Sequence, residues 1–225
     1  MRFALFVATI STFISPALPF SLSPADKNTA RNGSHLLWSV TASTQDAGVT
    51  ISARDKIAER LLVAVAEAGQ VGSKATEAQI DSVKALADEL TSYSERNPSR
   101  VPLVGVHSLL YSMSPGGSSG ALGPFIGRVT QTFPDDKRFI NAVRLGPLQI
   151  KLHAEREEID GQRIRVKFLE TSVEIFGAEV VRKETKGAGI WKNTFVGYIR
   201  GKDNSEKLLR VMETPSLFII EQPME

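Results

Sequence analysis

Between residues 103 and 222, apolar and polar residues alternate in short runs separated by turns rich in glycine, proline and aspartate. Alternation with a period of two is typical of strands that bury one face. The runs cover 106–113, 129–133, 139–145, 148–155, 164–175, 190–200, 208–212 and 217–220. About eight antiparallel strands with this spacing predict a mainly β fold, either a sandwich or a closed, lipocalin-like barrel.

Two runs on either side of the turn at 134–136 place amides among apolar residues. The residues expected to point inward are Val129, Gln131 and Phe133, then Phe139, Asn141 and Val143. A buried polar group without a hydrogen bond costs about 1–3 kcal/mol, so these two amides need partners. Either they bond each other and brace the hairpin, or they anchor the headgroup of a ligand.

The later runs carry charge close to apolar positions. Ile164, Val166 and Phe168 are expected to point inward and to alternate with Arg163, Arg165 and Lys167. The alternation changes phase at 169–172, which predicts a bulge. Arg210 shares its face with Leu208 and Met212, so we expect a semi-buried guanidinium. It would serve either in an ion pair with a carboxylate or as a donor in a binding site.

Apolar residues recur at helical spacing before the strands, over 54–68 and again after residue 76. Thr76 followed by Gln79 is a capping-box pattern at the start of the second helix. Residues 53–98 are therefore predicted to form a helical hairpin that covers one end or flank of the sheet. A coiled coil that binds a partner is the alternative.

The first fifty residues have the composition of targeting segments. Residues 1–20 hold an apolar run of signal-peptide length, too short to span a bilayer of about 30 Å. Residues 21–52 are rich in serine and threonine and poor in acidic residues, as transit peptides are. A signal peptide followed by a transit peptide that opens at Phe20 resembles the bipartite leaders of proteins sent to secondary plastids. Simple secretion is the alternative.

The composition limits the kinds of site and ligand that the chain can have. The chain has no cysteine, which excludes disulfides and thiolate sites, and its net charge of +2 argues against binding nucleic acid. It has three histidines and no carboxylate pair that stands apart from ordinary surface charge, so we predict no catalytic residues and no metal site. The cations at 163, 165 and 167 are expected to pair with Glu155 and Glu157. Contact with an anionic lipid surface is the alternative.

Several segments, taken in order, resemble the plastid lipid-associated protein or fibrillin family. They are Gly72–Thr76, Leu109–Ser112, Leu122–Gln131, Phe139–Asn141, Leu145–Leu148 and Leu208–Ile220. The likeness runs from about residue 57 to residue 222, within one expected family domain at 53–222. The chain departs from the family at His107, where members commonly have a tryptophan.

The resemblance implies a lipocalin-like antiparallel barrel over 103–222, preceded by the helical hairpin, in a protein of the plastid (chloroplast). It further implies a non-enzymatic protein at thylakoids or at the lipid droplets called plastoglobules, with a bound isoprenoid lipid or pigment such as a quinone or carotenoid. The ligand-binding residues we predict are Gln131, Asn141, Phe139, Val143, Phe168 and Arg210. The alternative is a structural protein with no ligand in its barrel, which docks onto a photosynthetic or isoprenoid-biosynthetic complex.

Overall fold

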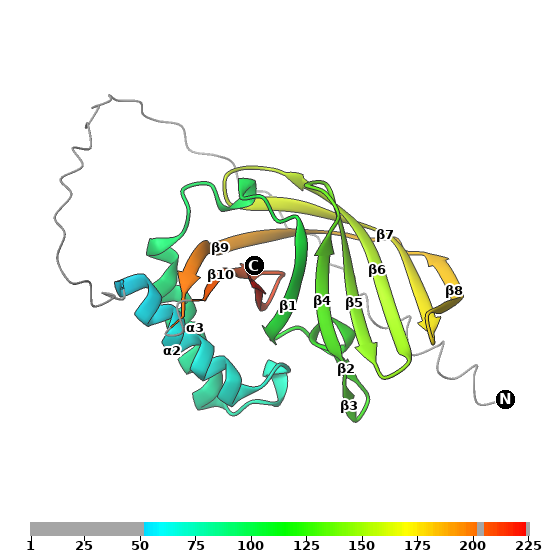
Figure 1. Ribbon diagram of the computed structural model, residues 1–225, viewed down its shortest axis with the longest axis horizontal. Coiled ribbons are helices and arrows are strands. Elements are labelled where there is room, and N and C mark those ends of the chain that lie inside the picture. The colour runs from blue at the N-terminus through cyan, green and yellow to red at the C-terminus, as the bar shows by residue number, and fades with distance from the viewer. Residues whose placement is uncertain (1–51, 202–204, 224–225) are drawn as a thin grey trace, which may run out of the picture.

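The computed structural model describes residues 52–201 and 205–223 (Figure 1). The predicted signal peptide, and all of the predicted transit segment except Ser52, lie outside these residues. Two helices come first, α2 (Ala53–Ala68) and α3 (Glu77–Leu90), before the strands. The strands are β1 (Gly105–Ser112), β2 (Ala121–Leu122), β3 (Phe125–Ile126), β4 (Arg128–Phe133), β5 (Arg138–Leu145), β6 (Leu148–Glu158), β7 (Arg163–Ile175), β8 (Ala178–Glu184), β9 (Ala188–Arg200), β10 (Glu206–Glu213) and β11 (Leu217–Pro223).

The large sheet is antiparallel, and its hydrogen bonding returns to the strand where it begins. The order is β6-β5-β4-β1-β11-β10-β9-β7, and β7 also pairs with β6. The first half of β7 pairs with β9, whereas its second half pairs with β8. The predictions of a mainly β chain and of an antiparallel sheet are confirmed. We call this closed series of strands the sheet ring.

Apolar side chains on the inner face of the sheet ring form two clusters. One contains Leu103, Phe133, Phe139, Ala154, Ile164, Val166, Val196 and Leu208. The other contains Leu109, Val129, Val143, Met212, Phe218 and Ile220. The half-buried Trp191 packs against both clusters, so they are parts of one interior. The inward face predicted for β4 and β5 is therefore confirmed.

The two helices pack on the outer face of the sheet, and Figure 1 shows them side by side along one flank. Leu61 and Leu90, both fully buried, meet Tyr111, Phe195 and Leu209 from β1, β9 and β10. The predicted capping box is present, because Thr76 N–H donates to Gln79 at 2.9 Å and Gln79 N–H donates to the Thr76 hydroxyl at 3.3 Å. The apolar faces of α2 and α3 are thus buried against each other and against the sheet. None of the helices in the described ranges is long and apolar enough to cross a bilayer.

The segment between α3 and β1 covers one end of the sheet ring, and we call this end the capped end. Ser99 N–H donates to Gly161 O at 2.9 Å, and the Ser99 hydroxyl donates to Asp160 O at 2.5 Å. These bonds fix the segment against the β6–β7 turn. Leu103, 1 % exposed, then enters the interior cluster beside Phe133. Leucine therefore fills this end of the interior.

The opposite end of the sheet ring carries the turns between β2 and β3, β5 and β6, and β7 and β8, and we call it the tip end. Phe176, in the β7–β8 turn, donates its N–H to Pro147 O of the β5–β6 turn at 3.0 Å. The β2–β3 hairpin leads directly into Arg128, which pairs with Arg144 at the end of β5. Three hairpin turns therefore gather at this end (Figure 1).

Candidate ligand site inside the sheet ring

Three polar residues follow one another across neighbouring strands on the inner face. His107 on β1 pairs with Gln131 on β4, and Gln131 pairs with Asn141 on β5. His107 is 0 % exposed and Gln131 is 1 % exposed. Four atoms of these residues are buried without a hydrogen-bond partner: His107 Nδ1, Gln131 Nε2, Gln131 Oε1 and Asn141 Oδ1. Hence the hydrogen-bonded amide pair that would brace the hairpin is not formed.

Arg210 on β10 points into the same interior from the other side of the ring. It is 1 % exposed, so the prediction of a semi-buried side chain was wrong. Its Nε donates to the Asn193 side-chain oxygen at 2.8 Å, while its Nη1 has no partner. Among the described residues, no carboxylate forms an ion pair with Arg210. We call His107, Gln131, Asn141, Asn193 and Arg210 the polar layer.

The Phe133 ring lies at the centre of this arrangement. The guanidinium carbon of Arg210 is 5.8 Å from the ring centroid, and that of Arg156 is 5.9 Å away. The His107 ring meets Phe133 edge-on at 5.2 Å. Phe139 stacks on Phe133 at 5.4 Å and contacts Trp191 at 5.5 Å. Aromatic faces attract nearby cations, which partly offsets the cost of burying them.

Burial sets the charge states of the polar layer. Burial, together with the neighbouring charge of Arg156, lowers the pKa of Arg210 to about 9. The guanidinium is still protonated at neutral pH. Burial also lowers the pKa of His107 to about 4, with a contribution from Arg210, so this imidazole is neutral. Its Nε2 lies 2.9 Å from Leu103 O, which can only accept, so Nε2 carries the proton and Nδ1 is an acceptor.

The predicted ligand residues divide into two groups. Gln131 pairs with Asn141 on the neighbouring strand, and Phe139 and Arg210 both contact the Phe133 ring. Val143 lies in the cluster toward the tip end, and the half-buried Phe168 packs against the cluster at the capped end. Their positions on the inner face are as predicted. Contact with a ligand stays a prediction.

Two members of the polar layer were not predicted as site residues. His107 alternates with Leu109, a sequence signal that places it on the inner face. Asn193 adjoins a bulge that shifts the register between β9 and β10, and alternation along β9 alone does not reveal this shift. Trp191 consequently lies inside with Asn193, whereas Phe195 meets the helices.

His153 is half-buried on the outer face of the sheet, opposite Glu170 in the neighbouring strand, and its Nε2 is buried without a partner among the described residues. This histidine lies on the other side of the sheet from the polar layer. Among the described residues, no group of histidine and carboxylate side chains is arranged to hold a metal ion.

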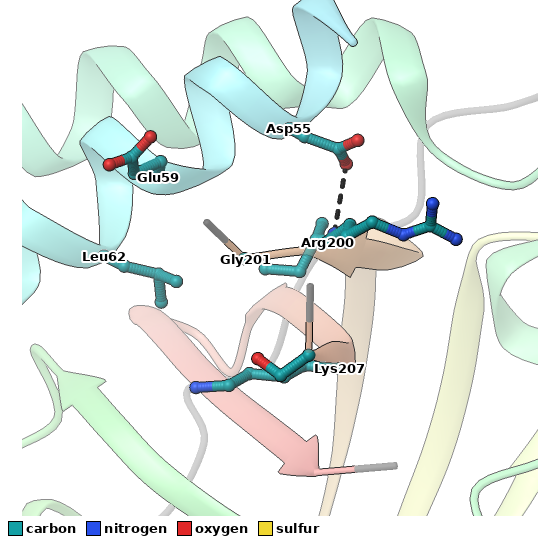
Figure 2. A pocket seen from close by; sticks show the side chains of 8 residues that line it. Asp55, Glu59, Leu62, Arg200, Gly201 and Lys207 are labelled. Carbon is teal, nitrogen blue, oxygen red and sulfur yellow. Dashed lines mark hydrogen bonds between the residues drawn. The ribbon is translucent and has the colours of Figure 1, made fainter. Parts of the chain in front are cut away.

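A surface hollow lies apart from the polar layer, between α2 and the ends of β9 and β10 (Figure 2). Asp55 fixes this junction by accepting a hydrogen bond from the backbone N–H of Arg200 at 3.4 Å. The hollow has a volume of about 100 Å³ and is lined by Asp55, Glu59, Leu62, Ile199, Arg200, Gly201, Ser205 and Lys207. Ligand sites usually measure about 300–1,000 Å³, so this hollow is too small for a lipid.

Comparison with known proteins gives no assignment. No protein-family model matches the chain, and neither a curated protein nor a solved structure is similar to it. The polar layer inside the sheet ring is therefore the feature of the chain that bears on its function.

Proposed function

We propose that this chain is a non-enzymatic plastid lipid-associated protein of the fibrillin type, with a lipocalin-like barrel that binds an isoprenoid lipid such as a quinone or a carotenoid. One observation carries the proposal: in an apolar interior, His107, Gln131, Asn141 and Arg210 have buried polar atoms without partners. Each such group costs about 1–3 kcal/mol, and a ligand that bonds it removes this cost.

Each predicted residue has a role in this proposal. Gln131, Asn141 and Arg210 orient the polar group of the lipid. Phe139, Val143 and Phe168 contact its apolar part, and burial of apolar surface contributes about 25 cal/mol per Å² before the entropic costs of binding. Delivery to a secondary plastid is proposed from the bipartite leader alone, which lies outside the described residues.

Binding a lipid requires side-chain movement inside the sheet ring. A lipid needs a volume of about 300 Å³ or more, and the surface hollow beside α2 includes no residue of the polar layer. Leu122 and Trp191 are half-buried neighbours of the interior cluster toward the tip end. These side chains are placed to move aside and admit an apolar chain from that end, and a change in Trp191 fluorescence would report the movement.

The tip end also supports attachment to a thylakoid or plastoglobule surface. Phe176 is 86 % exposed and Phe125 is 61 % exposed, and they project from two of the turns gathered there. Arg128 and Arg144 are exposed and directly opposite each other on the outer face of the same end. Exposed aromatic residues beside unopposed cations favour contact with an anionic lipid surface.

The alternative function, docking onto a protein complex without a ligand, has less support. Its surface would be the outside of the sheet or the helical hairpin, and the cations on β7 are part of that outer face. Arg163 pairs with Asp160 at 2.6 Å, and Arg165 pairs with Glu157 at 3.2 Å. Because these charges are matched within the chain, they offer a partner less attraction.

The proposal is tested with the protein as it is purified from its host. We expect an isoprenoid lipid in the organic extract, and saturable quenching of tryptophan fluorescence when the lipid-free protein is titrated with a short-chain prenyl benzoquinone. Trp191→Phe should abolish the quenching, whereas Trp38→Phe should retain it. Charge reversal at Arg163, Arg165 and Lys167 should leave it unchanged. Absence of both co-purified lipid and saturable quenching would overturn the proposal.

A further inference from the structure

Building on the proposed function, we infer that the bound lipid ends in an acid group, a carboxylate, which forms an ion pair with Arg210. Within the class of isoprenoid lipids, the ligand that binds most tightly is then an anionic amphiphile, and a neutral quinone or a hydrocarbon pigment binds less tightly. Arg210 is buried without a carboxylate partner among the described residues, and its bond to Asn193 holds its guanidinium inside the sheet ring.

The charge of Arg210 has no counterpart in the chain. A buried charge is stable only when it is paired and hydrogen-bonded, and the ion pairs of the described residues do not include this guanidinium. Among the described residues, the charge that acts on it is that of Arg156, which repels it. Arg156 donates to Asp136 O at 2.8 Å and to Ser99 O at 3.3 Å, and the charges of Asp136 and Glu158 act on Arg156 itself. The interior therefore has an unbalanced positive charge that a carboxylate would neutralise.

The guanidinium is held in a position to receive an anion. Nε is bonded to Asn193 at 2.8 Å, and one side of the group lies over the Phe133 ring. Nη1 is buried and unbonded, and Gln131 Nε2 is a second donor without a partner. A carboxylate oxygen accepts from Nη1 in a charge-assisted hydrogen bond, which is about twice as strong as a neutral one. A quinone carbonyl would accept from the same donor but leave the positive charge unbalanced.

The position of the polar layer sets the orientation of the ligand. Leu103 fills the capped end, so the acid group enters from the tip end and comes to rest at Arg210. The apolar chain then extends back along the cluster that contains Val129, Val143 and Phe218. His107 is neutral and presents an acceptor, so the positive charge available to the acid is that of Arg210.

The inference is tested with three probes that share one isoprenoid chain: retinoic acid, its methyl ester and retinol. Each is titrated into the lipid-free full-length protein while Trp191 fluorescence is followed. We expect the acid to bind at least about tenfold more tightly than the ester or the alcohol. Arg210→Met should remove this advantage, so that the acid binds no more tightly than the ester.

A second pair of variants keeps Arg210 in place. Asn193→Asp has the same shape and gives the guanidinium an internal counter-charge, so we expect it to weaken binding of the acid by about tenfold and to spare the ester. Asn193→Leu, the matched control without charge, should retain the preference for the acid.

The outcomes separate the two proposals. If the ester and the alcohol bind as tightly as the acid, or if Asn193→Asp leaves the acid preference intact, the acid group is refuted and lipid binding stands. If none of the probes binds and no lipid co-purifies, the proposed function itself fails.

Discussion

Arg210 Nε donates a hydrogen bond to the side-chain oxygen of Asn193 at 2.8 Å, and both residues are about 1 % exposed. The two residues lie on the neighbouring strands β10 and β9, so the bond ties the guanidinium to the wall of the sheet ring. It satisfies one of the five N–H donors of the arginine and none of its charge. The ligand-free protein therefore bears a cost at this position that the rest of the fold offsets.

Replacing this pair with apolar residues should stabilise the lipid-free protein. We expect Arg210→Met combined with Asn193→Leu to raise the free energy of unfolding by about 1–4 kcal/mol, because a buried charge is removed without leaving an orphaned amide. Urea denaturation followed by circular dichroism measures the change. Arg182→Met, at an exposed arginine on β8, is the control. A destabilised double variant would contradict the view that Arg210 is costly.

His107 should make stability depend on pH. Its pKa is lowered from 6.5 to about 4 in the folded protein, so the unfolded chain binds the proton more readily between these values. The free energy of unfolding should therefore fall as the pH drops from about 6.5 to about 4, by up to about 3 kcal/mol. Urea titrations across this range provide the measurement.

His107→Gln keeps an amide donor for Leu103 O and cannot titrate, so the stability of this variant should vary less over the same pH range.

Two carboxylates also have shifted pKa values. The pKa of Asp135 is lowered to about 2, chiefly by a hydrogen bond from Arg138, and the pKa of Asp160 is lowered chiefly by a hydrogen bond from the Gln162 backbone. Both carboxylates lose their stabilising effect at still lower pH, outside this window. Equal pH profiles for the variant and the unaltered protein would rule out the assignment to His107.

The helical hairpin and the sheet should unfold together, because one cluster joins them. Leu61 on α2 is fully buried against the sheet, and Leu61→Ala should cost about 2–5 kcal/mol. Val63 on the same helix is 53 % exposed, and Val63→Ala should change stability by less than about 0.5 kcal/mol. Helix and sheet signals in circular dichroism should show the same midpoint in denaturant. Separate midpoints would mean that the hairpin folds independently.

Removing the apolar side chains at the tip end should reduce attachment to lipid. We expect the triple variant Phe125→Ser, Ile126→Ser and Phe176→Ser to lose most of its sedimentation with vesicles that contain phosphatidylglycerol. Ile190→Ser is the control, because Ile190 is 58 % exposed on β9, away from these turns. Sedimentation that the triple variant leaves unaltered would exclude the tip end as the site of attachment.

Phe176 should trade stability against attachment. Its φ of 52° lies in the left-handed region, which costs about 1–2 kcal/mol for a residue other than glycine. Phe176→Gly should therefore raise the free energy of unfolding by about 1 kcal/mol while weakening vesicle binding. Gly177→Ala is the converse control, because φ is 81° there and a methyl group should destabilise the turn. A loss of stability in Phe176→Gly would show that the exposed ring is needed by the fold.

The sequence predicted those features of the helices and strands that depend only on residues close together in the chain. The capping box at Thr76 marked the start of α3, and the change of alternation after Phe168 marked the register shift in β7. β8 was not predicted, because its seven residues are all exposed and mostly polar, so they show no buried face. The short strands β2 and β3 have too few residues for a periodic signal.

The sequence predicted which residues of the candidate site point inward. It did not predict which groups surround them. Alternation placed Gln131, Asn141 and Arg210 inward. Whether Arg210 finds a carboxylate depends on which strands close the ring, and that pairing joins residues far apart in the chain. The bulge opposite Met212 also moved Phe195 to the other face of the sheet, a change that alternation within β9 alone does not reveal.

β8 is the strand at which the hydrogen-bonded order of the sheet stops, beyond its pairing with β7. It is exposed throughout and carries Glu179, Arg182, Lys183 and Glu184. Arg182 forms ion pairs with Glu179 and with Glu170 on β7, which keeps this charge at the surface of the strand. Charged side chains along an open strand oppose the addition of another strand. A β-rich chain of this kind therefore carries its own protection against edge-to-edge aggregation.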